Sequence, residues 1–198
     1  MIQLAKPSIS EDAIKRVSEV LRSGNLVQGK YVLEFEQKLT KYLEAENAII
    51  VSSGTAALHL SLLSVNIGLG DEVIIPAFTY PATANVVEIV GAKPVFVDIT
   101  LADFCIDVSK IEAAITDRTK AIMPVHEFGQ AADMEPIMAI AKQYDLKIIE
   151  DAACALGSEY KGKKAGTFGN MGCFSFHPRK AITTGEGGAI ITNDASLA

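Results

Sequence analysis

Several features that would mark a particular class of protein are scarce or missing in this sequence of 198 residues. It has no tryptophan, and its three cysteines are Cys105, Cys154 and Cys173. An odd number of widely spaced cysteines forms neither a zinc motif nor a disulfide framework. We therefore expect no metal site, and we expect a cytoplasmic protein whose thiols are reduced.

Long apolar runs and basic clusters are also missing. No uninterrupted apolar run reaches the ~20 residues that a membrane-spanning helix needs, and the start of the chain, MIQLAKPSISEDAIKRV, has no signal-peptide core. The net charge is −6, and an acidic chain without a basic stripe is a poor partner for nucleic acid or an anionic membrane. With 49% hydrophobic residues, the composition is that of one globular domain.

What the sequence does contain is a regular alternation of short apolar runs and longer amphipathic segments. Helices are expected at about 10–24, 32–44, from 55 onward, 81–90, 108–115 and 134–144. Strands are expected at about 48–51, 73–75, 95–97, 121–125, 147–150, 174–176 and 189–192, with a hairpin or loop at 157–166. This order predicts an α/β fold with a doubly wound, mostly parallel sheet flanked by helices on both faces.

Ligands of such folds bind beyond the carboxyl ends of the strands, and four stretches of this sequence fall there. The first, Ser52-Ser53-Gly54-Thr55-Ala56, joins a strand to the start of a helix. Free N–H groups and the positive end of the helix would suit an anion such as phosphate. Taken alone, however, a helix cap and a tight turn explain these residues more simply.

The second and third stretches also allow two interpretations each. Glu150 and Asp151 end a buried strand, where an aspartate either pairs with a protonated ring nitrogen or is a capping or solvated acid. In Phe78-Thr79-Tyr80, an aromatic ring either stacks on a flat ligand or packs into the core. Core packing is the more frequent fate of an aromatic side chain.

The fourth stretch, FSFHPRKAITTGEGGAI, places Lys180 after a strand and before a run of glycines. A lysine amine forms a Schiff base with a carbonyl only when it is unprotonated, a state that Arg179 beside it would favour. Alone, two exposed basic residues are the simpler explanation. Together, the four stretches supply an anion site, a stacking ring, an acid for a ring nitrogen and an amine for an aldehyde, which are the parts of a pyridoxal phosphate site.

These residues stand in segments that resemble the DegT/DnrJ/EryC1/StrS family of sugar aminotransferases, whose large domain has the fold type I architecture of pyridoxal phosphate enzymes. The similar segments occur in family order and cover nearly the whole chain: VQGKYVLEFEQKL, SSGTAALHLSLL, GDEVIIPAFTYPATANVV, GAKPVFVDI and IIEDAACALGSEYKGKKAGTFGNMGCFSFHPRKAITTGEGGAIIT. The last segment is the most specific of them.

The resemblance implies a role for each site residue. Lys180 would form the Schiff base with the cofactor and then act as general acid and base, Asp151 would pair with the pyridinium nitrogen, and Tyr80 would stack on the ring. The phosphate would be held by the backbone of Gly54 and Ala56 and by the hydroxyls of Thr55 and Ser175.

Two positions depart from the family pattern. Many members have glutamine at the position of Cys154, where the amide would bond the phenolic oxygen of the cofactor, and a thiol is a weaker partner. Glu127 stands where an apolar residue is more common, and either a surface position or a contact with substrate would explain it. We expect His126 to support the site and His177 to pack.

The family implies that an amino group moves from glutamate, through pyridoxal phosphate, to a keto group of a nucleotide-linked sugar, in a homodimer. Members usually continue well beyond the lysine, so residues 1–198 are expected to be the cofactor-binding large domain without the small C-terminal domain. One alternative is a sugar dehydratase of the same family, although those relatives replace the lysine with histidine. Another is a truncated, non-catalytic cofactor-binding or assembly module. A generic nucleotide-binding fold lacks support because no G-x-G-x-x-G follows a strand.

Overall fold

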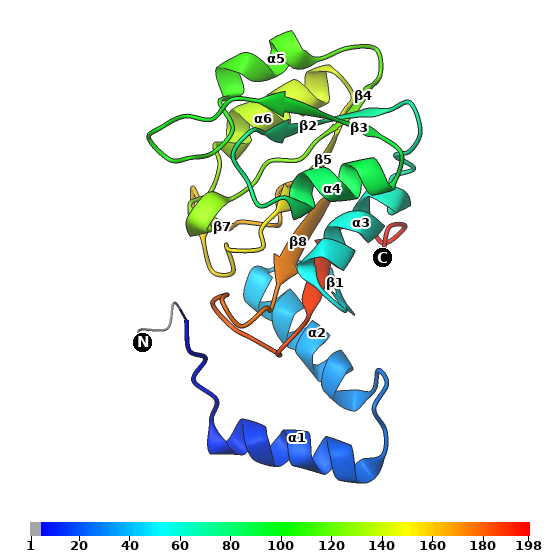
Figure 1. Cartoon of the computed structure of the whole chain (residues 1–198), viewed down its shortest axis with the longest axis vertical. Coiled ribbons are helices and arrows are strands. Elements are labelled where there is room, and N and C mark those ends of the chain that lie inside the picture. The colour runs from blue at the N-terminus through cyan, green and yellow to red at the C-terminus, as the bar shows by residue number, and fades with distance from the viewer. Residues whose placement is uncertain (1–4) are drawn as a thin grey trace.

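The computed structural model describes residues 5–198, and its helices and strands alternate as expected (Figure 1). The helices are α1 (Glu11–Ser23), α2 (Lys30–Leu43), α3 (Gly54–Ser64), α4 (Ala82–Ile89), α5 (Ile111–Ala114) and α6 (Met134–Gln143), with two short 3-10 turns at Val108–Lys110 and Glu127–Gly129. The strands are β1 (Asn47–Val51), β2 (Glu72–Pro76), β3 (Lys93–Val97), β4 (Thr119–Ile122), β5 (Lys147–Asp151), β6 (Glu159–Tyr160), β7 (Lys163–Lys164), β8 (Met171–Ser175) and β9 (Gly188–Thr192).

Three elements differ from the sequence prediction. The segment 108–115 is not one helix but a 3-10 turn followed by the four-residue helix α5, because Ile115 is already extended. Strand β4 ends at Ile122 rather than at 125, since Pro124 has no N–H to continue the ladder. Strand β8 begins at Met171, and its glycine at position 172 concealed this first half in the sequence.

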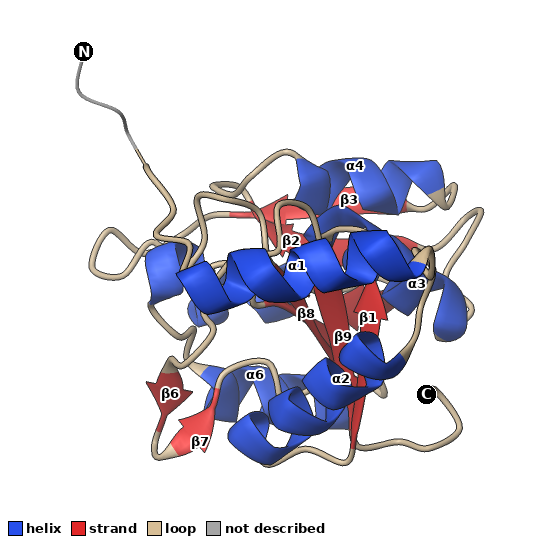
Figure 2. Ribbon diagram, turned by 90° about the horizontal axis from the view of Figure 1, so that it is seen from below, coloured by secondary structure: helices blue, strands red, loops and turns tan. Residues whose placement is uncertain are grey.

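The strands β1 to β5, β8 and β9 form one seven-stranded sheet in the order β1-β9-β8-β5-β4-β2-β3. Strand β9 is antiparallel to both of its neighbours, and the other pairs are parallel. The prediction of a doubly wound, mostly parallel sheet is therefore confirmed. Strands β6 and β7 form a separate hairpin, which lies below the sheet at the edge of Figure 2.

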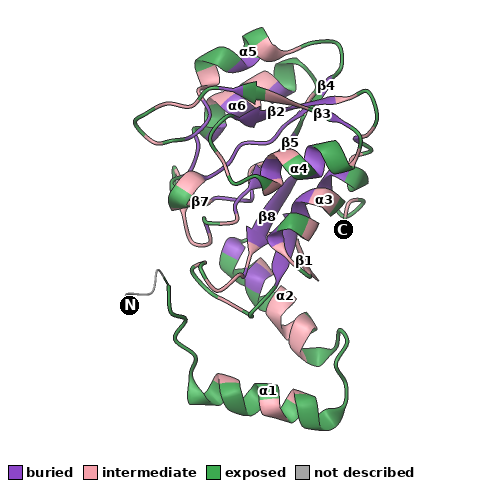
Figure 3. Ribbon diagram, viewed as in Figure 1, coloured by how far each residue is buried: buried purple, intermediate pink, exposed green. Residues whose placement is uncertain are grey.

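Helices cover both faces of the sheet because the side chains of the buried strands alternate between two cores. In β2, Val73 and Ile75 pack with residues of α3 and α4 on one face, whereas Ile74 packs with residues of α6 on the other. A third cluster, containing Phe174 and Phe176, lies where α2 meets β8 and β9. The purple strands at the centre of Figure 3 show this buried layer.

Helix α1 has the expected bounds but not the expected burial. The side chain of Ser10 accepts a hydrogen bond from the N–H of Ala13 at 3.2 Å, and Gly24 ends the helix with a φ of 72°. No residue of α1 is buried, and Val17 and Leu21 of its apolar face are 59% and 63% exposed. Figure 3 shows this helix at the periphery of the molecule, away from the sheet. Of the helices in the described residues, none has the length and apolarity needed to cross a membrane.

Candidate active site

The carboxyl ends of β1, β2, β5 and β8 open into one cavity of about 710 Å³. Its walls include most of the residues that the sequence analysis singled out, namely Gly54, Thr55, Tyr80, Asp151, Cys154, Ser175 and Lys180. Ala56 is the one predicted site residue that does not line the cavity. The topology of the sheet therefore brings together predicted site residues that lie up to 126 positions apart, from Gly54 to Lys180.

One wall of the cavity is the start of α3. The side chain of Ser53 caps this helix by accepting a hydrogen bond from the N–H of Ala56 at 3.0 Å. The N–H group that the sequence analysis assigned to a phosphate is therefore already bonded within the cap. The N–H groups of the first turn and the helix dipole still make this end of α3 favourable for an anion, and the exposed Thr55 adds a hydroxyl.

Two glycines allow the chain to pass closely around this helix start. A Cβ atom on Gly54 would lie 2.8 Å from the Cβ of Ser175, and one on Gly188 would lie 2.4 Å from the backbone carbon of Ser53. The hydroxyl of Ser175 therefore stands directly against the first residue of α3. The glycine run after Lys180 has a physical reason, because its last member packs backbone to backbone against the cap of α3.

Asp151, at the end of β5, is held on a second wall of the cavity. Its backbone N–H donates to the carbonyl of Pro124 at 2.9 Å, and its carbonyl accepts from the N–H of His126 at 3.0 Å. Its carboxylate accepts one bond on each oxygen, from the hydroxyl of Thr83 at 2.8 Å and from the N–H of Ala153 at 3.2 Å. Burial raises the pKa of this carboxyl, against the lowering effect of these two donors and of Lys180.

Behind Asp151, the neighbouring Glu150 points to the other side of β5 and is completely buried. Three backbone N–H groups within 166–169 donate to its carboxylate at 2.7–2.8 Å, and His126 Nε2 lies 2.8 Å from Oε2. The Nδ1 of His126 accepts from the N–H of Ala132 at 3.1 Å, so the ring proton is on Nε2 and faces Glu150. The predicted supporting place of His126 is thus a buried one that ties β5 to the loops around it.

The third wall is the loop that carries Lys180, between β8 and β9. Lys180 is half-buried, and its Nζ donates to the exposed Sγ of Cys154 at 3.0 Å. Among the described residues, no carboxylate lies within salt-bridge distance of this amine. His177, for which packing was expected, is half-buried in the cavity wall, and its Nδ1 accepts from the N–H of Arg179 at 3.3 Å.

Glu127 also lines the cavity, and a contact of its carboxyl with substrate stays a prediction. Partial burial raises the pKa of its carboxyl, as does the nearby charge of Asp151, whereas Lys180 opposes the shift. Beside it, the ring of Phe128 contacts those of Phe78 and Phe104 with centroids 6.0 and 6.1 Å apart. All three rings are exposed, and Phe128 is the one of them that lines the cavity.

Tyr80 lines the cavity with its side chain 71% exposed, so one face of its ring is available to a flat ligand. Thr83 was missed in the sequence analysis, although it touches Asp151 directly. The feature of the sequence that could have revealed it is its hydroxyl in the first turn of the helix in PATANVV, three residues after Tyr80. In the described part of the chain, no cluster of His, Cys, Asp or Glu is arranged to hold a metal ion.

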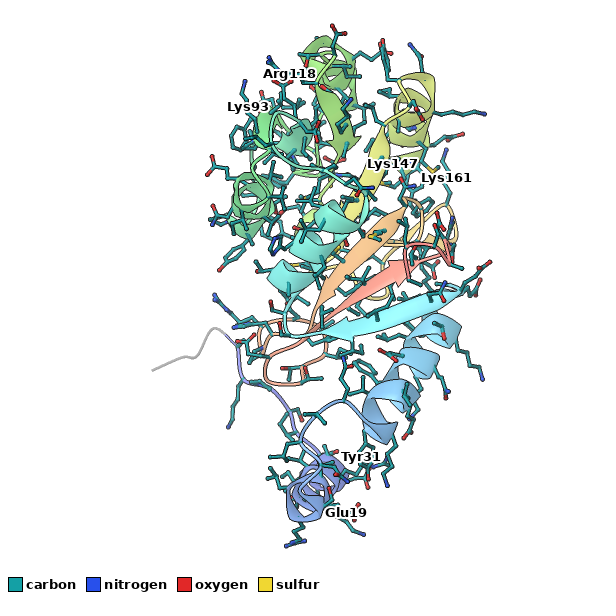
Figure 4. The ribbon with its side chains drawn as sticks, turned by 90° about the vertical axis from the view of Figure 1, so that its right-hand side faces the viewer. Glu19, Tyr31, Lys93, Arg118, Lys147 and Lys161 are labelled. Carbon is teal, nitrogen blue, oxygen red and sulfur yellow. The ribbon has the colours of Figure 1, made fainter. Side chains whose placement is uncertain are left out.

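A second cavity, of about 400 Å³, lies at the amino ends of β2 and β3. Its charged groups bond one another: Arg118 lies 2.7 Å from the buried carboxylate of Glu72, and Lys93 lies 3.6 Å from it. Figure 4 shows Lys93 and Arg118 together at this end of the molecule, far from α1. The carboxyl-end cavity is therefore the candidate active site, because its lysine and its aspartate are not paired in this way.

The sequence and the fold of this chain are similar to those of known proteins. The family model for DegT/DnrJ/EryC1/StrS aminotransferases matches residues 7–198. The chain is 52% identical over 170 residues to a GDP-perosamine synthase of Caulobacter vibrioides, covering 86% of this chain and 46% of the relative. It is 46% identical over 183 residues to a UDP-2-acetamido-2-deoxy-3-oxo-D-glucuronate aminotransferase of Pseudomonas aeruginosa. That match covers 92% of this chain and 51% of the relative.

Among solved structures, the chain is similar to the PLP-form of a Streptococcus pneumoniae protein, with a TM-score of 0.94 and 37% identity. That match covers the whole of this chain and 54% of the other. The chain thus spans about half the length of the relatives it matches. Its sheet has the fold type I architecture of pyridoxal phosphate aminotransferases. From the match over residues 7–198, we conclude that the chain belongs to the DegT/DnrJ/EryC1/StrS aminotransferase family.

Proposed function

We propose that this chain binds pyridoxal phosphate and takes part in moving an amino group from glutamate to a keto group of a nucleotide-linked sugar. The observation that carries the proposal is the placement of Lys180 and Asp151 in one cavity that also contains the start of α3. An amine, a buried acid and an anion site then surround a single space.

The residues present fit this cofactor. Gly54 lets Ser175 approach the start of α3, and the positive end of that helix lies at the same place. The carboxylate of Asp151 is desolvated without a cation bonded to it, so a protonated ring nitrogen would remove the cost of its burial. The cavity of about 710 Å³ has the size of pockets that hold a ligand of this class.

When bound, pyridoxal phosphate supplies an electron sink for breaking and forming bonds to nitrogen. The residues of this chain bind and orient it and move protons. Asp151 would hold the proton of the ring nitrogen, the amine of Lys180 would hold the aldehyde and carry protons as general acid and base, and Tyr80 would cover one face of the ring. Gly54, Thr55 and Ser175 would hold the phosphate. The N–H of Ala56 donates to Ser53 Oγ, so it would contact the phosphate only as a donor shared with that oxygen.

The names of the relatives support a sugar nucleotide as the substrate class. One relative is a GDP-perosamine synthase and another is an aminotransferase of a UDP-linked oxo-sugar. The PLP-form of the Streptococcus pneumoniae protein supports the choice of cofactor. Glutamate as amino donor rests on the family resemblance, and the retained Lys180 favours amine transfer over the loss of water.

We propose that residues 1–198 correspond to the large, cofactor-binding domain of the family. Because the chain spans about half the length of its relatives, the proposed activity is that of the whole protein. A homodimer and a cytoplasmic location stay predictions. The exposed apolar face of α1 is consistent with a helix that another subunit or further chain covers.

The test of the proposed function is a visible absorbance spectrum of the chain mixed with pyridoxal phosphate, followed by borohydride reduction and peptide mapping. We expect a yellow adduct that reduction fixes on Lys180 and on no other lysine. Lys180→Ala serves as the control and should retain no yellow adduct once the unbound pyridoxal phosphate, which is itself yellow, is removed. An adduct found only on exposed lysines such as Lys142, or unchanged colour in Lys180→Ala, would contradict the proposal.

A further inference from the structure

We propose that Thr83 is a positioning residue, whose hydroxyl holds the carboxylate of Asp151 in the orientation that meets a ring nitrogen in the cavity, and that Thr79 holds Thr83 in turn. This inference rests on the proposed function, since it gives the orientation of Asp151 a purpose. Thr79 lies in the segment that links β2 to α4 and Thr83 in the first turn of α4, whereas Asp151 comes from the end of β5, two strands away from β2 in the sheet.

The directions of the hydrogen bonds that link Thr79, Thr83 and Asp151 follow from their chemistry. The Oγ1 of Thr83 lies 2.8 Å from Asp151 Oδ2 and 2.8 Å from the Oγ1 of Thr79. An ionised carboxylate has no proton to give, so the single hydroxyl proton of Thr83 is donated to Asp151. The hydroxyl of Thr79 must then donate to Thr83. The two hydroxyls form a relay that ends on the carboxylate.

Burial shields the inner part of this relay, Thr83 and Asp151, from solvent. Thr83 is completely buried in the first turn of α4, and Asp151 is 5% exposed. Thr79 is half-buried and lines the cavity. The relay thus connects the cavity wall to the acid, and its outer end lies where a bound ligand would contact it.

The two bonded oxygens of Asp151 determine where its remaining lone pairs point. Oδ1 is bonded by the N–H of Ala153 and Oδ2 by Thr83, on two different elements. The main chain of Asp151 is clamped on both sides by residues 124–126. With the backbone fixed, rotation of the carboxylate is the remaining freedom, and Thr83 is the only side chain among the described residues that bonds it.

Other titratable groups near Asp151 are accounted for. Lys180 lowers the pKa of Asp151, as does His126, whose ring is bonded to Glu150 and to a backbone N–H. Glu127 lies in the same cavity wall, and Cys173 of β8 is a buried thiol whose pKa is raised by that burial. Within the described residues, none of these groups bonds the carboxylate of Asp151. A substitution of Thr83 therefore changes the titration of Asp151 without removing any other hydrogen-bond partner of that carboxylate.

The experiment compares Thr83→Val, which removes the hydroxyl at equal size, with Thr83→Ser, which keeps it. The first readout uses the cofactor-free chain: the pH titration of the Asp151 carboxyl by ¹³C NMR, assigned with Asp151→Asn. Thr83→Val should raise the proton affinity of Asp151 about tenfold, because a hydrogen bond to the charged form is lost, and Thr83→Ser should change it less than about threefold. Thr40→Val, an exposed hydroxyl on α2, is the matched control and should leave it unchanged.

The second readout is the dissociation constant of pyridoxal phosphate. Thr83→Val should raise this constant about tenfold, and Thr83→Ser should leave it nearly unchanged. An unchanged Asp151 titration in Thr83→Val overturns the inference. If that variant does not fold, Thr79→Val decides the matter, since the relay requires a smaller shift in the same direction and no shift overturns it. Failure of the parent chain to bind pyridoxal phosphate counts against the proposed function, and the titration still tests the relay.

Discussion

The two walls of the cavity that carry Asp151 and Lys180 are built in opposite ways. Asp151 lies at the end of a buried strand, with its backbone and both carboxylate oxygens bonded. Lys180 lies in an irregular loop between β8 and β9, and its amine has one weak partner, the thiol of Cys154. On the first wall the acid itself is fixed by its bonds, whereas on the second wall the loop backbone is hydrogen-bonded but the amine has a single partner.

The difference separates two kinds of requirement. A group that must stay oriented benefits from fixed donors around it, because the fold then supplies the orientation, although burial itself disfavours its charged form. A group that must form and break bonds needs access and freedom to move. Substitutions on the Asp151 wall should therefore change stability together with activity, and substitutions on the Lys180 wall should change activity alone.

The largest effect is expected for Lys180→Ala in the full-length protein. Amine transfer should be abolished, while the free energy of unfolding of the cofactor-free chain should change by less than about 0.5 kcal/mol, as for other partly exposed positions. Single-turnover absorbance measures the first quantity and denaturant unfolding the second. A stability loss comparable to that of a core substitution would contradict the contrast between the walls.

Glu150→Gln should give the largest loss of stability. The amide replaces one carboxylate oxygen with an NH₂ group that faces donors, either His126 Nε2 with a backbone N–H or two backbone N–H groups. Leaving buried donors unpaired should cost about 3 kcal/mol. Urea unfolding of the cofactor-free chain measures this loss. Glu127→Gln, in the cavity wall, is the control and should cost less than about 1 kcal/mol.

The same contrast decided what the sequence could predict. The alternation of elements, the caps of α1 and α3 and the position of Asp151 at a strand end follow from local patterns, and the structure shows them. The bonds that fix Asp151 do not, because Thr83 is 68 residues away and meets it only through the order of the strands. Likewise, nothing local distinguishes Glu150, which turns into the core, from Asp151, which faces the cavity.

Asp151→Asn should reveal the cost of burying a carboxylate in the cofactor-free chain. Burial raises the pKa of Asp151 above its ordinary value of 3.8. The stability that this group contributes is therefore present below about pH 3.8 and is lost as pH rises through the raised pKa. Relative to the parent chain, the asparagine variant should thus gain stability between acidic and neutral pH.

Urea unfolding of both proteins across this pH range measures the gain. If the free energies of unfolding of the two proteins depended on pH in the same way, the charged form of Asp151 would be as stable in the cofactor-free protein as in water. With pyridoxal phosphate bound, the order should reverse, because the carboxylate then has a cationic partner that an amide cannot replace. The asparagine variant should accordingly lose most amine transfer even though its fold is stable.

The smallest effect is expected for Cys154→Gln, which restores the amide that many family members have at this position. Cys154 is exposed, so the free energy of unfolding should change by less than about 0.5 kcal/mol. The amide would replace a weak thiol partner with a stronger donor for the phenolic oxygen of the cofactor. The dissociation constant of pyridoxal phosphate should then fall by about two- to fivefold, a fraction of one hydrogen bond.

Cys154→Ala is the matched control for this substitution, because it removes the thiol without adding an amide. If the glutamine variant binds more tightly than both the parent and the alanine variant, the gain comes from the new donor. If glutamine and alanine strengthen binding equally, the thiol itself restrains Lys180 through their 3.0 Å contact. The second result would mean that the loop of Lys180 is held more firmly than its exposure indicates, and the contrast between the two walls would be smaller.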